Sequence, residues 1–222
     1  MEEKQPKKER ANMTELYFIR HGETVINQEK KVNGAHVDTP LTAAGVAGAK
    51  AAGRELQATK FDQVLVSPQK RAQTTAKLVL QENLAQQHNP LPLQVVPNLH
   101  EMSFGDWEGQ PVTACFQDPA IQKLRAAPLT YDPSSFHGET FASVLKRGRN
   151  FLQQTVTAYP QQRLLVVGHG MMLTLMLKTA QGFSVPEIMQ RPYLDNASIS
   201  VLTSTDGQHF KTERWNDVHF LA

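Results

Sequence analysis

The chain has 222 residues, of which 40% are hydrophobic and 20% are charged, and its formal net charge is +2. This length and composition suffice for a buried core and exclude a fibrous or largely disordered protein. The small net charge argues against nucleic acid as a partner, because domains that bind nucleic acid are usually strongly basic. A single cysteine excludes an intramolecular disulfide and a cysteine-rich zinc site.

Residues 1–12 carry charges of both signs and no apolar run, which predicts a solvated tail before a single domain over residues 13–222. They lack the apolar segment of a secretory signal. The apolar stretch at residues 164–177 is interrupted by glycines and is shorter than the roughly 20 residues that span a bilayer. We therefore expect a cytoplasmic protein without a membrane partner. The sequence leaves a homodimer open.

The first half of the chain predicts short strands separated by helices. Three apolar runs are typical of buried strands, at residues 16–19, 64–66 and 93–96. Thr42 is a good N-cap for a helix in which small and apolar residues recur at helical spacing from Val46 to Leu56. Ser67 and Pro68 are expected to be the N-cap and the first residue of a second helix.

The second half begins with residues 103–138, whose prolines and short helical patches predict an insertion that forms a cap. A helix, a buried strand, an apolar helix and two hairpin strands are expected after it, at residues 139–152, 164–167, 171–177, 198–202 and 209–213. Strands that alternate with helices predict a three-layer α/β/α fold with a mainly parallel sheet, to which the final hairpin adds an antiparallel edge.

Polar side chains follow the predicted strands at their carboxyl ends, where ligands bind in open α/β sheets. Two histidines, two arginines and a carboxylate collect at this rim, namely Arg20, His21, Arg71, Glu101 and His169. Guanidinium groups bind phosphate oxygens, and the amides at the starts of nearby helices are expected to add positive potential. A neutral imidazole can attack phosphorus, and a carboxylic acid can protonate the leaving alcohol. The rim therefore suits a phosphate ester.

Five motifs follow one another along the chain, beginning with Arg20-His21-Gly22-Glu23-Thr24. The others are Pro40-Leu41-Thr42, Ser67-Pro68 with Arg71-Ala72, Glu101 before Phe104-Gly105-Asp106-Trp107-Glu108-Gly109, and Val167-Gly168-His169-Gly170. In this order they resemble the motifs of the histidine phosphatase superfamily, the phosphoglycerate mutase-like proteins. The resemblance extends over about residues 14–205.

The resemblance implies covalent catalysis by His21, which would form a phosphohistidine. Glu101 would protonate the leaving group and then act as the base that activates water or an acceptor hydroxyl. His169 would assist as a second catalytic histidine. The family requires neither a metal nor an organic cofactor, and its substrates are small phosphate esters.

The resemblance also implies which residues bind the ligand. Arg20, Arg71 and His169 would hold the phosphoryl oxygens, and Asn27 would assist them. Asn33 and Gly34 would contact phosphate or substrate, partly through their backbone. Three departures lie in segments expected at the mouth of the site: Asn33 where the family often has glutamine, a longer loop at residues 35–39, and His137 in place of a glycine. These departures leave the substrate unspecified.

The sequence allows more than one role for several residues. Glu23, Glu108 and Glu139 compete with Glu101 as the acid. Asn27 could cap a helical turn, and His36 and His137 could be surface residues or substrate contacts.

Three functions remain open. A phosphatase is favoured by the complete set of residues and by the Phe104–Gly109 motif. A phosphoglycerate mutase is less favoured, because the segment after that motif offers only Lys123 and Arg125 to hold a second anionic group. A catalytically silent phospho-ligand binding protein would usually lack the nucleophile or the acid, and neither is missing.

Overall fold

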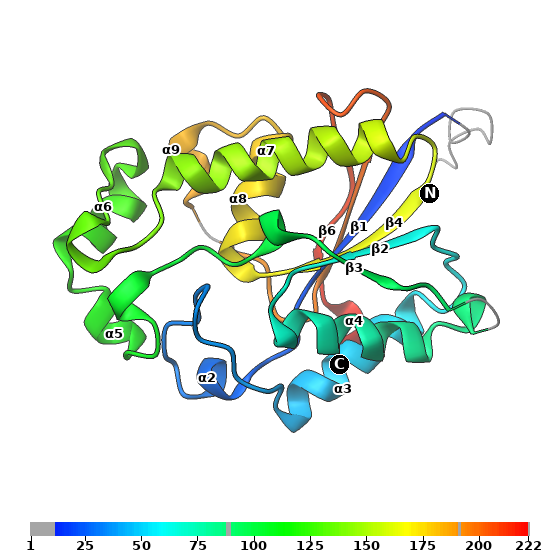
Figure 1. Ribbon diagram of the computed structural model, residues 1–222, viewed down its shortest axis with the longest axis horizontal. Helices are drawn as coiled ribbons and strands as arrows, with labels where there is room; N and C mark the ends of the chain where they lie inside the picture. Colours follow the sequence, from blue (N-terminus) through cyan, green and yellow to red (C-terminus); the bar gives the residue numbers. More distant parts are fainter. Residues whose placement is uncertain (1–11, 88–89, 191, 222) are drawn as a thin grey trace.

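The computed structural model describes residues 12–87, 90–190 and 192–221, so the predicted N-terminal tail lies outside the described residues except for Asn12. A six-stranded sheet in the order β3-β2-β4-β1-β5-β6 crosses this part of the chain (Figure 1). Its parallel strands are β1 (Thr14–Arg20), β2 (Gln63–Val66), β3 (Leu93–Val95) and β4 (Arg163–Gly168). The antiparallel strands are β5 (Ile199–Ser204), next to β1, and β6 (Lys211–Asp217). The predicted antiparallel edge is confirmed.

Side chains of the central strands alternate between two hydrophobic cores, one on each face of the sheet. In β4, Leu164 and Val166 belong to one core, whereas Leu165 and Val167 belong to the other. Helices α7 (Phe141–Ala158) and α8 (Gly170–Ala180) cover one face, and α3 (Ala43–Glu55) and α4 (Lys70–Glu82) cover the other (Figure 1). Because both faces are covered, the strands are apolar throughout rather than alternately polar. The predicted three-layer α/β/α fold is confirmed.

The predicted start of α4 is wrong. The helix begins at Lys70 with Gln69 as its N-cap, not at Ser67 and Pro68. The carboxylate of Asp38 accepts hydrogen bonds from the backbone amides of Lys70 and Arg71, so the cap comes from a distant loop.

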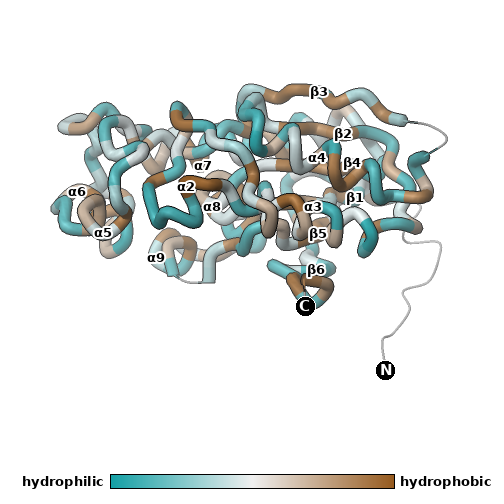
Figure 2. Tube along the Cα trace, turned by 90° about the horizontal axis from the view of Figure 1, so that it is seen from below, coloured by the Kyte–Doolittle hydropathy of each residue, from teal (hydrophilic) through white to brown (hydrophobic). Residues whose placement is uncertain are grey.

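The cap consists of short helices between β3 and α7. It contains α5 (Val112–Cys115), α6 (Pro119–Ala126) and the 3₁₀ turns η3 (Gly105–Trp107), η4 (Pro128–Thr130) and η5 (Ser134–Phe136). Figures 1 and 2 both place α5 and α6 at one end of the long axis. Apolar cap residues such as Ile121 and Leu124 share the core that contains α7 and α8, so the cap is packed against the body.

The remaining elements are short: α2 (Val25–Gln28), α9 (Val185–Ile188), η1 (Leu84–Gln86), η2 (Pro97–Leu99) and η6 (His219–Leu221). Helix α2 follows β1 directly, and α9 follows α8. None of the helices in the described part of the chain combines the length and apolar character that crossing a bilayer requires.

Candidate active site

His21 lies just beyond the end of β1 and is 2% exposed. Its Nδ1 lies 2.8 Å from the carbonyl oxygen of Gly22. Since a carbonyl only accepts hydrogen bonds, Nδ1 carries the proton, and Nε2 keeps its lone pair. Burial, followed by the charges of Arg71 and Arg20, lowers the pKa of His21 well below its usual value of 6.5. The imidazole is therefore neutral near pH 7 and available as a nucleophile.

The glycine of the Arg20-His21-Gly22 motif permits close packing of two backbones. A Cβ at Gly22 would lie 2.3 Å from the carbonyl oxygen of Gly45 at the start of α3. The amide of Gly22 also donates to Oγ1 of Thr75 in α4, at 3.0 Å. These contacts fix the backbone turn that carries His21.

Arg20, Arg71 and His169 surround His21. Arg71 is 1% exposed, and its two terminal nitrogens donate to the carbonyl oxygens of Val37 and Gly34, each at 2.8 Å. The ring centroids of His169 and His21 are 5.2 Å apart. Burial and the charge of Arg71 also lower the pKa of His169 well below 6.5. The predicted histidines and arginines thus come together around one buried point.

Each of these three neighbours has a buried nitrogen without a hydrogen-bond partner in the described part of the chain, namely Arg20 Nε, Arg71 Nε and His169 Nδ1. Buried polar atoms in proteins are nearly always paired. Two of the three nitrogens belong to guanidinium groups, which only donate. This pattern suits an anionic ligand with several acceptor oxygens.

Glu101 is 4% exposed and lines the same cavity as His21. Its Oε1 accepts from the amides of Met102 and Met172, each at 2.8 Å, and its Oε2 accepts from the amide of Met171 at 3.0 Å. Among the described residues, Oε2 has no second hydrogen-bond donor. The carboxylate is held rigidly at the start of α8, as proton transfer to a bound ester would require.

The three competing carboxylates are engaged elsewhere, and none of them lines the cavity. Glu23 accepts from the hydroxyl of Thr42, and Glu139 pairs with Arg147. Glu108 accepts from the amides of residues 35–37, which ties their loop to residues 101–109, called the acid loop because the segment begins at Glu101. Among the described residues, Glu101 is thus the one carboxylate that lines the cavity beside His21.

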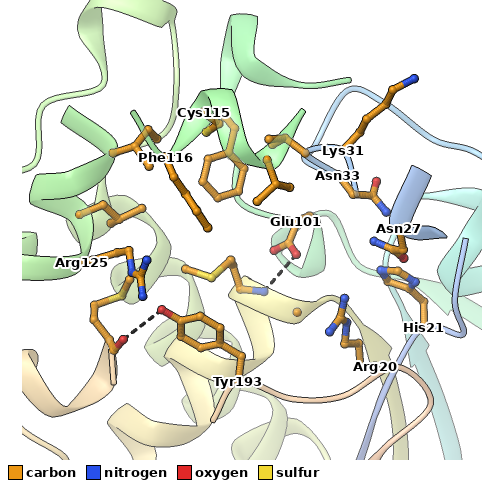
Figure 3. A pocket seen from close by; sticks show the side chains of 18 residues that line it. Arg20, His21, Asn27, Lys31, Asn33, Glu101, Cys115, Phe116, Arg125 and Tyr193 are labelled. Carbon is orange, nitrogen blue, oxygen red and sulfur yellow. Dashed lines mark hydrogen bonds between the residues drawn. The ribbon is translucent and has the colours of Figure 1, made fainter. Parts of the chain in front are cut away.

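The cavity encloses about 240 Å³ between the end of the sheet and the cap (Figure 3). Arg20, Asn27 and Asn33 line it together with His21 and Glu101. The side chain of Asn27 also accepts from the amide and hydroxyl of Thr24. Asn27 therefore both caps α2 and faces the cavity.

Other predicted residues lie outside the cavity lining. The carbonyl oxygen of Gly34 accepts hydrogen bonds from Arg71 and Gln69. Arg71 and His169 are buried next to His21 and do not line the cavity. His36 and His137 line a separate surface groove, where His137 pairs with Asp106.

The helix starts do not supply free amides for a phosphate in the way the sequence suggested. One first-turn amide of α3 is bonded to Thr42, two of α4 are bonded to Asp38, and two of α8 are bonded to Glu101. The positive charge next to His21 thus comes from guanidinium groups.

Two residues that hold loops of the site together, Gln69 and Arg147, were not predicted from the sequence. Gln69 donates to the carbonyl oxygen of Gly34 at 2.9 Å and accepts from the amide of Glu101 at 2.8 Å, so it joins two loops of the site. Arg147 donates to the carbonyl oxygens of Asn98 and His100, which lie just before Glu101 in the chain. Arg147 could have been found, because it interrupts the apolar stripe of its helix; Gln69 offers no such signal.

Among the residues that the structure describes, no three His, Cys, Asp or Glu side chains converge in the way metal ligands do. The side chains of Arg20 and Arg71 beside His21 carry guanidinium groups, which donate hydrogen bonds and do not coordinate metals as carboxylates do. This arrangement is chemically suited to binding a phosphoryl group between two arginines, next to a neutral imidazole and a fixed carboxylate.

Comparison with known proteins agrees with this geometry. The model of the histidine phosphatase superfamily (branch 1) matches residues 16–218. The adenosylcobalamin/alpha-ribazole phosphatase of Escherichia coli (strain K12) is 35% identical over 162 residues, which are 73% of this chain and 76% of that protein. The uncharacterized phosphatase PhoE of Bacillus subtilis (strain 168) is 29% identical over 91% of this chain and 92% of its own length. Bacillus stearothermophilus YhfR has a solved structure that matches with a TM-score of 0.83 and 29% identity, covering 94% of this chain and all 100% of that one. The chain belongs to branch 1 of the histidine phosphatase superfamily.

Proposed function

We propose that the protein is a phosphatase that hydrolyses small phosphate monoesters through a phosphohistidine on His21, without a metal or an organic cofactor. The observation that carries the proposal is the set of unpartnered buried nitrogens on Arg20, Arg71 and His169 around a neutral imidazole. The oxygens of a phosphoryl group can accept hydrogen bonds from both guanidinium nitrogens. They can also accept from Nδ1 of His169 when that nitrogen carries the ring proton.

In the proposed first step, Nε2 of His21 attacks phosphorus while the bond to the leaving oxygen breaks. The guanidinium groups of Arg20 and Arg71 stabilise charge on the transferring oxygens. Glu101, protonated on Oε2, gives its proton to the leaving alcohol. In the second step, Glu101 takes a proton from water, which displaces His21 and releases inorganic phosphate.

Hydrolysis is favoured over the mutase reaction by the cations near the cap. A mutase must hold a second anionic group while the phosphoryl group returns to another hydroxyl. Lys31 lines the cavity, but its ammonium lies 2.8 Å from Glu29, which offsets its charge. Of the two cap cations, Lys123 does not line the cavity, so Arg125 is the remaining cation on the cap side among the described residues of the lining. The relatives reported above that are named for an activity are phosphatases, which supports the same choice.

A cytoplasmic location, a homodimer and the absence of nucleic-acid and membrane partners remain predictions. The proposed reaction needs only the phosphate ester and water. A small soluble ester is the substrate type that this proposal requires.

Incubation with a ³²P-labelled phosphate monoester, with and without 3-phosphoglycerate as acceptor, tests the proposal. We expect free phosphate and an acid-labile phosphoenzyme that is lost in His21→Ala and retained in His36→Ala, a control histidine outside the cavity. Label in a second position of the acceptor would establish the mutase instead. Retention of label by His21→Ala would reject His21 as the nucleophile, and the absence of any phosphoenzyme or turnover would favour a silent binding protein.

A further inference from the structure

The polar groups of the cavity are concentrated at one end. Figure 3 shows Asn27, Arg20 and His21 together on one side, with Arg125 on the opposite side. Asn27 and Asn33 are both bonded to Thr24, which keeps their amides near the phosphate end. With its phosphate at this end, the rest of a substrate would lie outside the polar cluster, towards the other end of the cavity.

The other end of the cavity is lined by apolar side chains from the cap and from the segment around α8 and α9. These side chains are Val112, Phe116, Ile121, Leu124, Met171 and Met189. Ile121 and Leu124 are 1% and 3% exposed and belong to the core, so their part of the wall is fixed by packing, whereas Phe116 is 38% exposed. A sugar in this position would lose hydrogen bonds to water without gaining partners, which is unfavourable.

Two polar side chains, Tyr193 and Arg125, also line the cavity at this end. The hydroxyl of Tyr193 donates to the carbonyl oxygen of Met189 at 3.0 Å, which leaves its ring as the surface towards the cavity. The guanidinium carbon of Arg125 lies 5.2 Å from the ring centroid of Phe116, and Arg125 has no carboxylate partner among the described residues. Stacked guanidinium and aromatic groups present flat surfaces that suit another ring.

The cavity is small and open to solvent, so its volume describes the part of a ligand that lies inside it. About 240 Å³ is below the roughly 300–1,000 Å³ common for small-molecule sites. Phe116 and Tyr193 lie on opposite sides of this space (Figure 3). One ring beside a phosphate fits this description better than a large polar ligand does.

We propose that the site selects phosphate monoesters whose alcohol part carries a single aromatic ring, which lies against Phe116 and Arg125 of the cap. Recognition of this part is by apolar and stacking contact rather than by hydrogen bonds. The proposal rests on the proposed phosphatase function and specifies the substrate class of that same site.

Benzyl phosphate and glycerol 3-phosphate test the proposal, because both release a primary alcohol and so place a similar demand on the acid. We expect kcat/KM to be roughly tenfold higher or more for benzyl phosphate, the factor typical of burying an apolar group of this size. Phe116→Ser should reduce this ratio severalfold. Leu129→Ser is the matched control, since Leu129 is an apolar cap residue that is 76% exposed and does not line the cavity.

Binding of phosphonates measures the same preference without turnover. We expect benzylphosphonate to bind roughly tenfold more tightly than methylphosphonate in calorimetry, and Phe116→Ser to reduce the difference. Equal binding of the two phosphonates, a preference for glycerol 3-phosphate, or an unchanged ratio in Phe116→Ser would overturn the inference. Failure of the proposed function has a different signature, since neither ester would then be hydrolysed and no phosphoenzyme would form, whatever the phosphonates show.

Discussion

The imidazole rings of His21 and His169 lie with their centroids 5.2 Å apart and their planes tilted by 57°. Both rings are buried beside the charges of Arg20 and Arg71, which lower the pKa of each histidine. A third or fourth positive charge in this space is unfavourable. The arrangement therefore holds two neutral imidazoles next to two fixed cations, which is a suitable electrostatic environment for a phosphoryl dianion.

The buried histidines should make the protein less stable in acid. Their pKa values are lowered in the folded state, so below about pH 6.5 the unfolded chain binds protons that the folded chain does not. Stability is fully present above this pH and falls as the pH decreases, by up to about 1.4 kcal/mol per pH unit for each imidazole. Urea denaturation between about pH 7.5 and pH 5.5 measures this slope.

His169→Gln should make that slope shallower, because it removes one of the two groups. The exposed His36→Gln is the control and should leave the slope as it is in the unaltered chain. A slope that His169→Gln does not change would show that His169 takes up its proton equally well in the folded and unfolded states.

Glu101→Gln should slow hydrolysis by a factor that depends on the leaving group of the ester. An amide cannot give up a proton as a carboxylic acid does, so we expect kcat for alkyl phosphates to fall about 10²- to 10⁴-fold. Activated aryl phosphates, whose leaving groups need no proton, should lose much less in the first step. Single-turnover kinetics separates that step from hydrolysis of the phosphoenzyme. An equal loss for both ester types would argue against Glu101 as the acid.

Arg147 should position the acid loop. It donates to the carbonyl oxygens of Asn98 and His100 at 2.8 and 2.7 Å and pairs with Glu139 at 2.9 Å. Arg147→Met would leave the partly buried Glu139 with Ser143 but without its cationic partner. Breaking a fully buried pair costs about 3–5 kcal/mol, so we expect a smaller but clear loss here. Arg149→Met, on the exposed side of the same helix, should cost little. Denaturant unfolding of the two variants measures the difference.

Arg147→Lys keeps the charge but loses the Nε–Nη2 fork that holds both carboxylate oxygens of Glu139, and with it the fixed position of Nη1, which donates to the two carbonyl oxygens. We expect it to slow alkyl phosphates more than aryl phosphates, as Glu101→Gln does. The double variant with Glu101→Gln should then show less than the sum of the two effects. Additive effects would mean that Arg147 acts on stability alone.

Gly105→Ala should loosen the contact between the acid loop and the turn at residues 136–138. Gly105 has a φ of +51°, and a Cβ there would lie 1.8 Å from the carbonyl oxygen of Phe136. Gly182 is the matched control, because its φ is +81° and a Cβ there would contact nothing within 4 Å. Gly182→Ala should cost only the conformational term of about 1–2 kcal/mol, and Gly105→Ala clearly more. Equal changes in the unfolding midpoint would contradict the close contact at Gly105.

The sequence by itself determined the layers of the fold and the residues at the rim of the sheet. Leu16, Val64 and Leu164 lie in apolar runs whose pattern is local, so strands and their order in the chain could be predicted without the fold. The positions just beyond these runs then placed His21 and His169 near each other, because parallel strands end at the same edge. The roles of these residues remain predictions that the experiments above test.

The tertiary structure decided which groups are free and which are already bonded. Asp38, from a distant loop, sets the start of α4, and the amides of α8 hold Glu101 rather than a phosphate. Glu108 and Glu139 are carboxylates of the same type as Glu101, and only their partners exclude them from the cavity. Hydrogen bonds and ion pairs of this kind join residues far apart in the chain, and no local pattern of residue types encodes them.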